Sequence, residues 1–464
     1  MIYDKFSQLE LQSHNLWWIR QELIHEDTKI IEFEQQTYQW FHAFYSDFPL
    51  QEDAILTLRG PRQVGKTTFL KLLIRRLLIE DKIPRQAIFF YSCDRIKDYD
   101  ELFYLLTAYL DFVKARISTR IFIFLDEISF VREWQRAIKA LSDSGRLKNT
   151  LLLFTGSNIL DIKFSSERLP GRRGKIFKPD IEILPLDFSE FLRLIKPEFK
   201  QREYHEIFSM HFAELQKYFE DFLLTGGYLA NINNYYSLGF IPSYMYEIYF
   251  NWIEGDLHKA GKSDDTALKI FDRLRFHLTS PISFYKLARE SGVSSHLTIS
   301  DYLDILEKMF VLFKTEYFSI EQKRTDSKKN RKLYFYDPFI FQVVLTKMDG
   351  FLDDAYNYSR RIMFEETFRP KAAEMLVGSF LRQYFNQLYY GSSSLGEVDF
   401  VGKAQGKYSF FEVKYQNRLQ SKEFYKFKNL LKKITIITKT HLVMEGDITL
   451  VPLEIFLAFK ENFI

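Results

Sequence analysis

The chain has 464 residues, 46% of them apolar and 27% charged, and its 64 basic and 61 acidic side chains leave a net charge of +3. This composition is that of a folded globular protein and excludes a largely disordered or fibrous chain. The length suits about three to four domains. Because the charges nearly cancel, a nucleic-acid partner has to be held by local patches.

Cys93 is the single cysteine, which excludes an intrachain disulfide and a cysteine-cluster zinc site. The amino terminus lacks the basic start and apolar run of a secretory signal. No stretch reaches the ~18 consecutive apolar residues that a spanning helix needs. The sequence therefore predicts a cytoplasmic protein with no membrane partner.

Changes of hydrophobic pattern divide the chain into five segments. From Ala54 to Thr155, short apolar runs alternate with amphipathic helices, which predicts an α/β fold with a parallel sheet sandwiched between helices. Later segments are helical and then mixed. The predicted segments are a helical packing extension (1–50), this α/β core (51–190), a helical lid (191–265), a winged helix-turn-helix (266–345) and a small α/β domain (346–464).

A glycine-rich loop follows the first predicted strand. Residues 60–67 read Gly-Pro-Arg-Gln-Val-Gly-Lys-Thr, the pattern G-x-x-x-x-G-K-[ST] between strand and helix. Backbone N–H groups of such a loop surround a phosphate, its lysine reaches the terminal phosphates and its threonine ligates Mg²⁺. The alternative is a plain turn. The residues predicted to contact nucleotide are Gly60, Pro61, Arg62, Gln63, Val64, Gly65, Lys66, Thr67 and Thr68, with Thr67 also a metal ligand.

Two carboxylates, Asp126 and Glu127, follow the apolar run 121–125. An acidic pair alone is usually a solvated turn. At the end of a buried strand and together with the phosphate loop, however, it is a Walker B pattern. We expect Asp126 to hold the magnesium shell and Glu127 to polarise the attacking water.

Two further segments carry candidate catalytic residues. Ser157 and Asn158 follow the apolar run 151–155. At the end of a strand they either orient water and sense the γ-phosphate or simply cap the strand. Arg172 and Arg173 lie between glycines on an expected loop. An arginine there either enters a neighbour's site and stabilises transition-state charge, or belongs to a solvated basic turn.

These motifs resemble, together with residues 184–191 and Gly226-Gly227-Tyr228, the prokaryotic AAA-superfamily ATPases that carry a C-terminal winged helix and nuclease-like domain. Leu229 departs from the resemblance, because relatives tend to have proline there. The resemblance implies ATP hydrolysis with Mg²⁺ by an ASCE-type core. It is also compatible with a homo-oligomer. It assigns Glu127 as catalytic base, the Ser157 region as first sensor and an arginine near Arg172 as a finger.

Residues 281–309 predict a helix pair. The first helix is expected to begin after Ser283 and to end at Gly292, and the second to begin after Ser294 or Ser295 with Leu297 on its apolar stripe. A basic run, 322–332, lies between two predicted strands and reads as a wing. It either binds DNA phosphates or is a solvated loop, with packing against the ATPase or a partner as a further alternative. The predicted DNA contacts are Lys323, Arg324, Lys328, Lys329 and Arg331.

The terminal segment places charged residues on two predicted strands. Glu412 and Lys414 are two residues apart and share a strand face, and Asp399 lies on the expected partner strand. With Glu374 from a helix, these residues resemble a PD-(D/E)XK nuclease core, which would bind divalent metal and activate water. A surface charge pair is the alternative. The lysine-rich run 421–433 supplies either phosphate contacts or a solvated face.

The sequence thus leads to two functional hypotheses. In the first, a cytoplasmic ATPase moves a DNA-binding winged helix and a nuclease-like domain, by analogy in mobile-element or foreign-DNA handling. In the second, nucleotide gates assembly or partner binding, and an inactive nuclease-like domain only docks on nucleic acid or protein.

Overall fold

The computed structural model describes residues 8–156, 169, 171–175, 179–393, 396–419, 431 and 433–464. The chain forms two compact units, Met1–Leu184 and Pro185–Ile464. This division falls a few residues before the predicted end of the α/β core at 190. The reason is the segment that leads into helix α7 (Phe188–Ile195). Leu186, two residues before the helix, donates its backbone N–H to the Gly227 carbonyl of the second unit.

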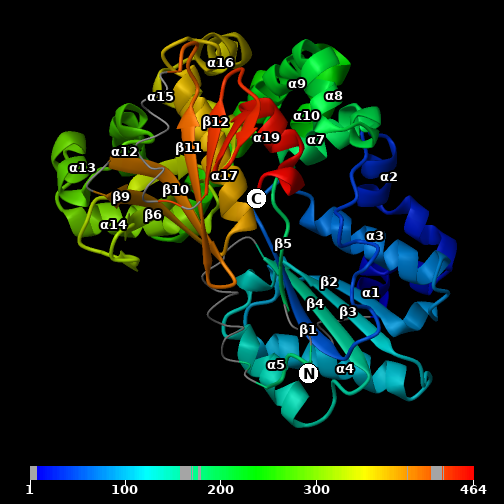
Figure 1. Ribbon diagram of the computed structural model, residues 1–464. Helices are drawn as coiled ribbons and strands as arrows, with labels where there is room; N and C mark the ends of the chain where they lie inside the picture. The colour runs from blue at the N-terminus through cyan, green and yellow to red at the C-terminus, as the bar shows by residue number, and fades with distance from the viewer. Residues whose placement is uncertain are drawn as a thin grey trace. The chain divides into compact units, whose positions relative to one another are not determined.

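The first unit contains the predicted parallel sheet, which is confirmed. Its strands lie in the order β2-β3-β4-β1-β5, and every neighbouring pair is parallel (Figure 1). One strand, β4, therefore lies between the strand that leads into the glycine-rich loop and the strand that ends in the acidic pair. The strands are β1 (Ala54–Arg59), β2 (Ile88–Ser92), β3 (Ile121–Asp126), β4 (Thr150–Gly156) and β5 (Asp180–Glu182).

Helices cover both faces of this sheet. Strand β3 shows why its sequence is continuously apolar: Phe122 and Phe124 pack into the core under α3, while Ile121, Ile123 and Leu125 pack into the core under α4 and α5. Figure 1 shows α3 on one side of the strands and α4 and α5 on the other. The helices are α3 (Lys66–Ile79), α4 (Tyr99–Lys114) and α5 (Trp134–Asp143), with short 3-10 turns at Arg85–Ala87, Cys93–Arg95 and Ile128–Phe130.

The N-terminal extension covers the exposed edge of β2. The side chain of Asn15 accepts from the backbone N–H of Phe90 at 2.7 Å and donates to its carbonyl at 3.0 Å, as a neighbouring strand would. The indole N–H groups of Trp17 and Trp18 donate to the Ile88 carbonyl. The backbone groups of an edge strand are thus satisfied by side chains. The elements are α1 (Gln8–His14), α2 (Thr28–Glu34) and 3-10 turns at Leu16–Trp18 and Gln21–Glu26.

The second unit begins with helices, as expected for the lid. A capping box formed by Asp187 and Glu190 begins α7. The Gly226-Gly227 turn packs on buried Asp337, which accepts from the Gly227 N–H at 2.8 Å, and a Cβ on Gly226 would lie 2.1 Å from that carboxylate. The following helices are α8 (Tyr204–Met210), α9 (Phe212–Thr225), α10 (Leu229–Leu238) and α11 (Ser243–Lys259), with a 3-10 turn at Pro197–Gln201.

The predicted helix pair and hairpin are present. Ser283 caps α13, Gly292 ends it in the left-handed conformation, and Ser295 rather than Ser294 caps α14. Leu297 departs from its predicted place on the apolar stripe: it is 65% exposed and Ile299 is buried instead. The elements are α12 (Asp264–His277), α13 (Phe284–Ser291), α14 (His296–Lys308), β6 (Leu312–Ser319), β7 (Arg324–Thr325) and β8 (Lys332–Phe335).

These strands do not form a sheet of their own. Strand β6 also pairs in parallel with β9, so one nine-stranded sheet runs from the hairpin into the terminal segment, in the order β13-β14-β12-β11-β10-β9-β6-β7 with β8 on β6. Phe318 and Ser319 of β6 pair with β7 on one edge and with β9 on the other, so β9 uses the edge that the hairpin leaves open. The predicted boundary at 345 also falls inside α15 (Pro338–Met348).

The remaining elements complete this sheet and its helices. The strands are β9 (Gln387–Ser393), β10 (Gly396–Ala404), β11 (Lys407–Lys414), β12 (Ile434–Thr438), β13 (Val443–Glu445) and β14 (Ile448–Pro452). The helices are α16 (Ala355–Met363), α17 (Arg369–Tyr384) and α19 (Leu453–Ala458), with 3-10 turns at Leu352–Asp354 and Lys460–Asn462.

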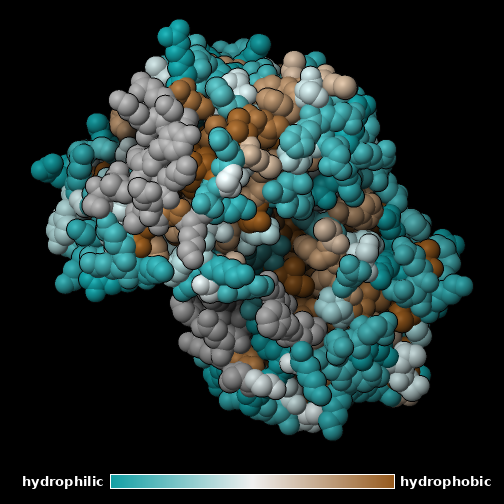
Figure 2. Space-filling model, viewed as in Figure 1, coloured by the Kyte–Doolittle hydropathy of each residue, from teal (hydrophilic) through white to brown (hydrophobic). Residues whose placement is uncertain are grey.

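Within the described ranges, no helix combines the length and the apolar character that crossing a bilayer requires. The face seen in Figure 2 is mainly hydrophilic, with smaller apolar areas between charged side chains. Cys93 is buried and carries a free thiol.

Candidate functional site

The glycine-rich loop joins the end of β1 to the start of α3, as predicted. Gly60 has no room for a side chain, because a Cβ there would lie 1.9 Å from the Ile183 carbonyl oxygen. Gly65 has a φ of 91°, which only glycine adopts readily. Both glycines of the motif are therefore required by the path of the backbone. The loop leads directly into the amino end of α3. The free N–H groups and the dipole at this end of a helix favour the binding of an anion.

Lys66 is folded back over this loop. Its side chain is 6% exposed, and its ammonium group donates to the carbonyls of Gly60 at 3.0 Å and Pro61 at 2.8 Å. A lysine held by two carbonyls of the loop that surrounds the phosphate lies where it can bind the terminal phosphates of a nucleotide.

The acidic strand end meets the loop through Thr67. The Thr67 hydroxyl donates to Asp126 Oδ2 at 2.7 Å, although the two residues lie on separate elements. This hydroxyl and this carboxylate are hard oxygen ligands, the type that Mg²⁺ prefers. The two predicted metal ligands, Thr67 and Asp126, are thus in contact, and their chemistry fits a magnesium ion.

Thr155, to which sequence analysis gave no role of its own, links the central strand to the same site. Its hydroxyl donates to Asp126 Oδ1 and accepts from the Glu127 backbone N–H at 3.0 Å. Glu127 itself has a φ of 51°, a left-handed backbone uncommon for a non-glycine residue and frequent at functional sites. The available sequence signal was a polar residue at the end of the apolar run 151–155.

The two predicted arginines do not lie at this site. Arg172 forms a bidentate ion pair with Asp143 at the end of α5, at 2.5 and 3.2 Å, and this hydrogen bonding lowers the pKa of Asp143. Arg173 donates to Asp180 and to the Ile55 carbonyl in the first half of β1, whereas the phosphate loop follows the other end of that strand. Ser157 and Asn158 lie outside the described residues.

Comparison with known proteins agrees with this geometry. Residues 52–192 match the family described as an AAA domain. This segment is therefore similar to an AAA domain. Residues 216–349 match a family described as a domain of unknown function (DUF8612).

Relatives and solved structures match this chain at low identity. An uncharacterized protein of Haemophilus influenzae is 25% identical over 413 residues, which cover 85% of this chain and 92% of the relative. An uncharacterized protein of Methanocaldococcus jannaschii is 26% identical, and the match covers 65% of this chain and 64% of the relative. A Walker-type ATPase of Pyrococcus abyssi has a TM-score of 0.41 at 14% identity, covering 70% of this chain and 97% of that one. The ORC2 protein of Aeropyrum pernix has a TM-score of 0.39 at 11% identity, covering 68% and 96%.

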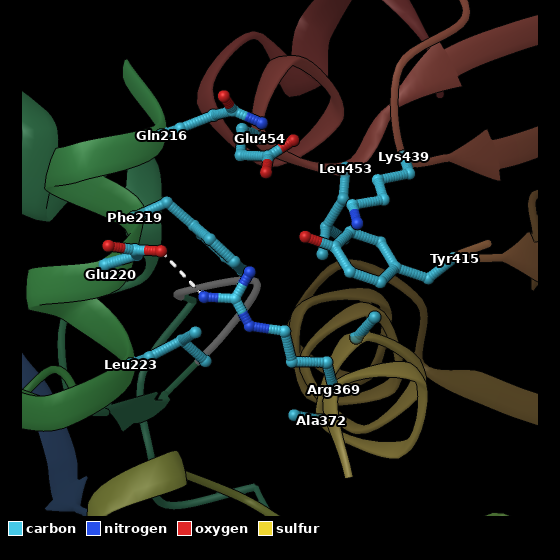
Figure 3. Close-up of a pocket in the computed structure, with 11 residues that line it drawn as sticks. Gln216, Phe219, Glu220, Leu223, Arg369, Ala372, Tyr415, Lys439, Leu453 and Glu454 are labelled. Carbon is cyan, nitrogen blue, oxygen red and sulfur yellow. Dashed lines mark hydrogen bonds and ion pairs between the residues drawn. The ribbon is translucent and has the colours of Figure 1, made fainter. Parts of the chain in front are cut away.

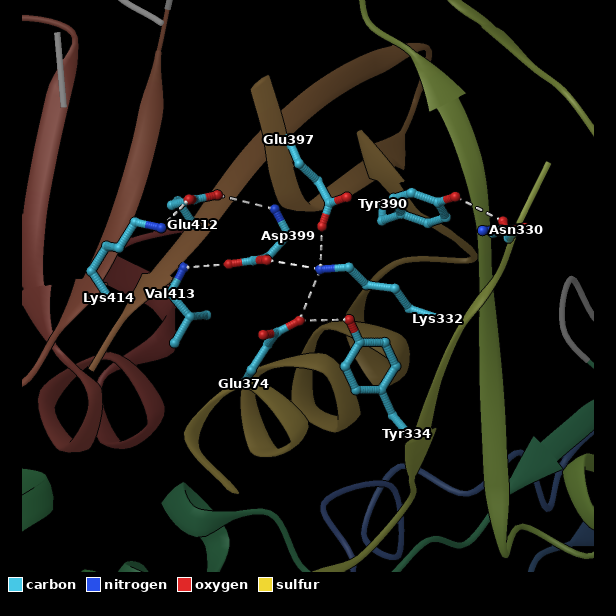
Figure 4. Close-up of polar contacts among 10 residues, drawn as sticks. All are labelled: Asn330, Lys332, Tyr334, Glu374, Tyr390, Glu397, Asp399, Glu412, Val413 and Lys414. Carbon is cyan, nitrogen blue, oxygen red and sulfur yellow. Dashed lines mark hydrogen bonds and ion pairs between the residues drawn. The ribbon is translucent and has the colours of Figure 1, made fainter. Parts of the chain in front are cut away.

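Outside the segment that matches the AAA family, the second unit contains a buried charge cluster around Lys332 (Figure 4). The ammonium group of this lysine, which is 1% exposed, lies 3.1 Å from Glu374, 2.8 Å from Glu397 and 2.9 Å from Asp399. Burial opposes its charge, but the surrounding acidic groups hold the pKa of Lys332 well above its usual range. Tyr334 on the same strand donates to Glu374 at 2.8 Å.

The other members of the predicted nuclease-like set join this cluster. Asp399 Oδ2 accepts from the Val413 N–H at 2.9 Å, and the Asp399 N–H donates to Glu412 Oε2 at 3.1 Å. Lys414 pairs with Glu412 Oε1 at 2.6 Å. The structure therefore brings together all four predicted residues, and it adds a lysine that sequence analysis assigned to the basic run.

Protein donors already contact the carboxylates of this arrangement. Both side-chain oxygens of Asp399 and both of Glu412 already accept a hydrogen bond or ion pair from a nitrogen donor. A metal would need those oxygens as ligands, and it would have to replace the Lys332 ammonium as the countercharge. Lys332 and Lys414 supply two positive charges to the four carboxyl groups, and burial raises the pKa of Glu374 to about 8.

The predicted DNA-contact residues lie on the hairpin between β6 and β8. Lys323, Arg324, Lys328 and Lys329 are exposed. Arg331 instead lies at the base of the hairpin: its backbone pairs with Ile282, and its guanidinium lies 4.9 Å from the centre of the Phe284 ring. The lysine-rich run 421–433, apart from Leu431 and Lys433, lies outside the described residues.

Proposed function

We propose that the AAA domain binds ATP with Mg²⁺ and hydrolyses it. The observation that carries this proposal is the Thr67–Asp126 contact at 2.7 Å, which joins the phosphate loop to the acidic end of β3. Loop N–H groups and Lys66 bind the phosphates, and Thr67 and Asp126 hold the cation. The bound cation neutralises charge that develops on the transferred phosphoryl group.

Glu127 acts as the base in this proposal. Its backbone N–H donates to the Thr155 hydroxyl, which also bonds to Asp126. Thr155 therefore fixes the position of Glu127 relative to the Asp126 carboxylate. A carboxylate beside the cation site orients the attacking water and accepts its proton. An assay of phosphate release from ATP by the purified full chain tests the proposal. The absence of turnover in Mg²⁺ would contradict it.

We further propose that the hairpin of the second unit contacts nucleic-acid phosphates. Four exposed cations lie on this short hairpin, and α13 and α14 precede it in the order of a winged helix. The first turn of α14 includes exposed Leu297 and half-buried His296, whose ring stacks on Tyr285 of α13 at 3.9 Å. These side chains offer few groups that read bases, so the expected binding is independent of sequence.

The hairpin is tested by the salt dependence of DNA binding. The full chain is required, because β6 belongs to the nine-stranded sheet and an isolated segment 266–345 would lose its β9 partner. The triple variant Lys323→Ala/Lys328→Ala/Lys329→Ala is expected to bind DNA at least about tenfold more weakly at low salt. It is also expected to lower the slope of log K against log salt by about 1 per lysine.

A matched triple variant provides the control for this measurement. Lys200, Lys217 and Lys259 are also exposed lysines of the second unit, and their replacement by alanine removes the same charge from other surfaces. Fluorescence anisotropy with one duplex, across a range of salt concentrations, compares the two variants. Equal slopes for both would show that the hairpin is not the contact surface.

For the nuclease-like cluster, the structure favours the docking hypothesis over cleavage, because the oxygens of Asp399 and Glu412 are already occupied by nitrogen donors. The full chain is therefore expected to leave plasmid and single-stranded DNA uncut in Mg²⁺ or Mn²⁺, as judged on gels. Cutting that disappears in both Glu412→Ala and Lys414→Ala would overturn this expectation. Cutting that persists in both variants identifies a contaminating nuclease.

A further inference from the structure

A second polar site lies at the carboxyl ends of β11, β12 and β14, which are adjacent and parallel. The residue that follows each strand lines one cavity: Tyr415 after β11, Lys439 after β12 and Leu453 after β14. Ligands of sheets with parallel strands characteristically bind outside the carboxyl ends of those strands. Helices α9 and α17 form the other walls (Figure 3).

The cavity has an apolar wall and converging polar tips. Its volume is about 110 Å³, well above the ~10–15 Å³ that one water needs. Phe219 and Leu223 of α9 supply apolar surface, and the tips of Arg369, Tyr415 and Glu454 point toward one another in Figure 3. This combination of apolar walls and a few placed polar groups is typical of small-molecule sites.

Two buried polar atoms of residues that line the cavity have no hydrogen-bond partner among the described residues. They are Oε2 of Glu454, a side chain only 1% exposed, and Nε of Arg369. Leaving such atoms unpaired costs about 1–3 kcal/mol each. Arg369 pairs with Glu220 at 2.7 Å through another nitrogen, so its guanidinium is positioned while Nε stays available.

The charges that face Glu454 favour an anion. Arg369 and Lys439 are cationic, Glu220 is already paired with Arg369, and Lys439 donates to Asn417 at 2.7 Å beside the Tyr415 ring. Burial raises the pKa of Tyr415, so its hydroxyl remains a donor at neutral pH. Burial also raises the pKa of Glu454 to about 7, so near neutral pH this carboxyl is protonated in about half the molecules.

We propose that this cavity binds a small oxyanion, the phosphate or carboxylate group of a small molecule, through Arg369, Lys439 and Tyr415 with Glu454 as a further donor. The site is separate from the nucleotide site of the AAA domain. Because an ionised Glu454 would repel the oxyanion, affinity falls as pH rises. For a carboxyl that titrates near neutrality, the expected loss is about tenfold between pH 6 and pH 8.

The test uses the full chain in a Lys66→Ala background, so that the phosphate loop does not contribute and a failure here is separate from a failure of the nucleotide proposal. Calorimetric titrations with sulfate, which does not titrate between pH 6 and pH 8, are expected to show saturable binding below about 10 mM. Inorganic phosphate, acetate and adenosine monophosphate are the other probes. Their relative affinities distinguish a phosphate group, a carboxylate and a larger phosphorylated ligand.

Three variants and one control assign the binding to this cavity. Arg369→Gln and Tyr415→Phe are each expected to weaken binding about tenfold or more, while Arg382→Gln, at the other end of α17, leaves it unchanged. Glu454→Gln, which always offers an N–H donor, is expected to keep binding and lose the pH dependence. The proposal is overturned if no probe binds, if neither Arg369→Gln nor Tyr415→Phe weakens binding, or if Glu454→Gln keeps the tenfold pH effect.

Discussion

Glu127→Gln is expected to bind ATP about as tightly as the wild type and to lower kcat by about 100- to 10,000-fold, the range of positioned general bases. Glutamine keeps the shape of the side chain but is not basic. The backbone at this position is held by the Thr155 hydroxyl and keeps its left-handed conformation, so the substitution leaves the site assembled. Equilibrium ATP binding and steady-state phosphate release, measured on the same preparation, separate the two effects.

Glu133→Gln is the matched control for this variant. It makes the same chemical change at an exposed glutamate whose φ of 53° is close to the 51° of Glu127. It therefore reproduces any general effect of the substitution on a left-handed residue, without touching the nucleotide site. Unchanged turnover in Glu127→Gln would remove Glu127 from the role of base.

Lys66→Ala is expected to weaken ATP binding by at least about 100-fold, and turnover is expected to fall below detection. Hydrogen bonds to charged groups contribute about 1.5–3 kcal/mol each, and a lysine that bonds to β- and γ-phosphate oxygens supplies two or more. The ammonium group is already held at 2.8 and 3.0 Å from the loop carbonyls, so the Lys66 side chain loses little further conformational entropy when nucleotide binds.

Lys139→Ala, at an exposed position of α5, provides the control for the loss of one positive charge. Circular dichroism of both variants shows whether the fold is intact. Binding by Lys66→Ala within a few-fold of the wild type would show that the loop does not hold the triphosphate in the proposed way.

Local patterns were sufficient to predict the first unit. Short apolar runs and the spacing of Gly60, Gly65 and Thr67 specify a strand, a tight loop and a helix, because each depends on residues close in sequence. The convergence of Thr67 and Asp126 followed from the rule that parallel strands end at the same sheet edge. Thr155 received no role because one threonine at the end of an apolar strand has no distinctive pattern.

The second unit depends on contacts distant in sequence, which the sequence does not reveal. The pairing of β6 with β9 merges the predicted winged helix and terminal domain into one sheet, and no local pattern specifies that register. The same pairing explains why Lys332 is buried among carboxyl groups. In the sequence it belongs to a basic run, but on β8 it shares a strand face with Tyr334, and both side chains contact Glu374 of α17.

Leu297 and Arg331 are single residues whose surroundings local sequence patterns did not predict. The helical period placed Leu297 on the apolar stripe, yet the turn that leads into α14 leaves it outside and Ile299 inside. Charge alone grouped Arg331 with the exposed cations, whereas its backbone pairs with Ile282 and holds the hairpin against the start of α13. The exposure of Leu297 and the contacts of Arg331 therefore depend on where each residue lies in a turn or a β-bridge, not on its residue type.

The most direct test of the account is a titration of the purified full chain with ATP, in Mg²⁺ and again after chelation of the metal. The contact between the phosphate loop and the acidic end of β3 predicts saturable uptake of one ATP per chain, tighter in Mg²⁺ than in its absence. A protein that is folded by circular dichroism, yet takes up no purine nucleoside triphosphate in Mg²⁺, would contradict it.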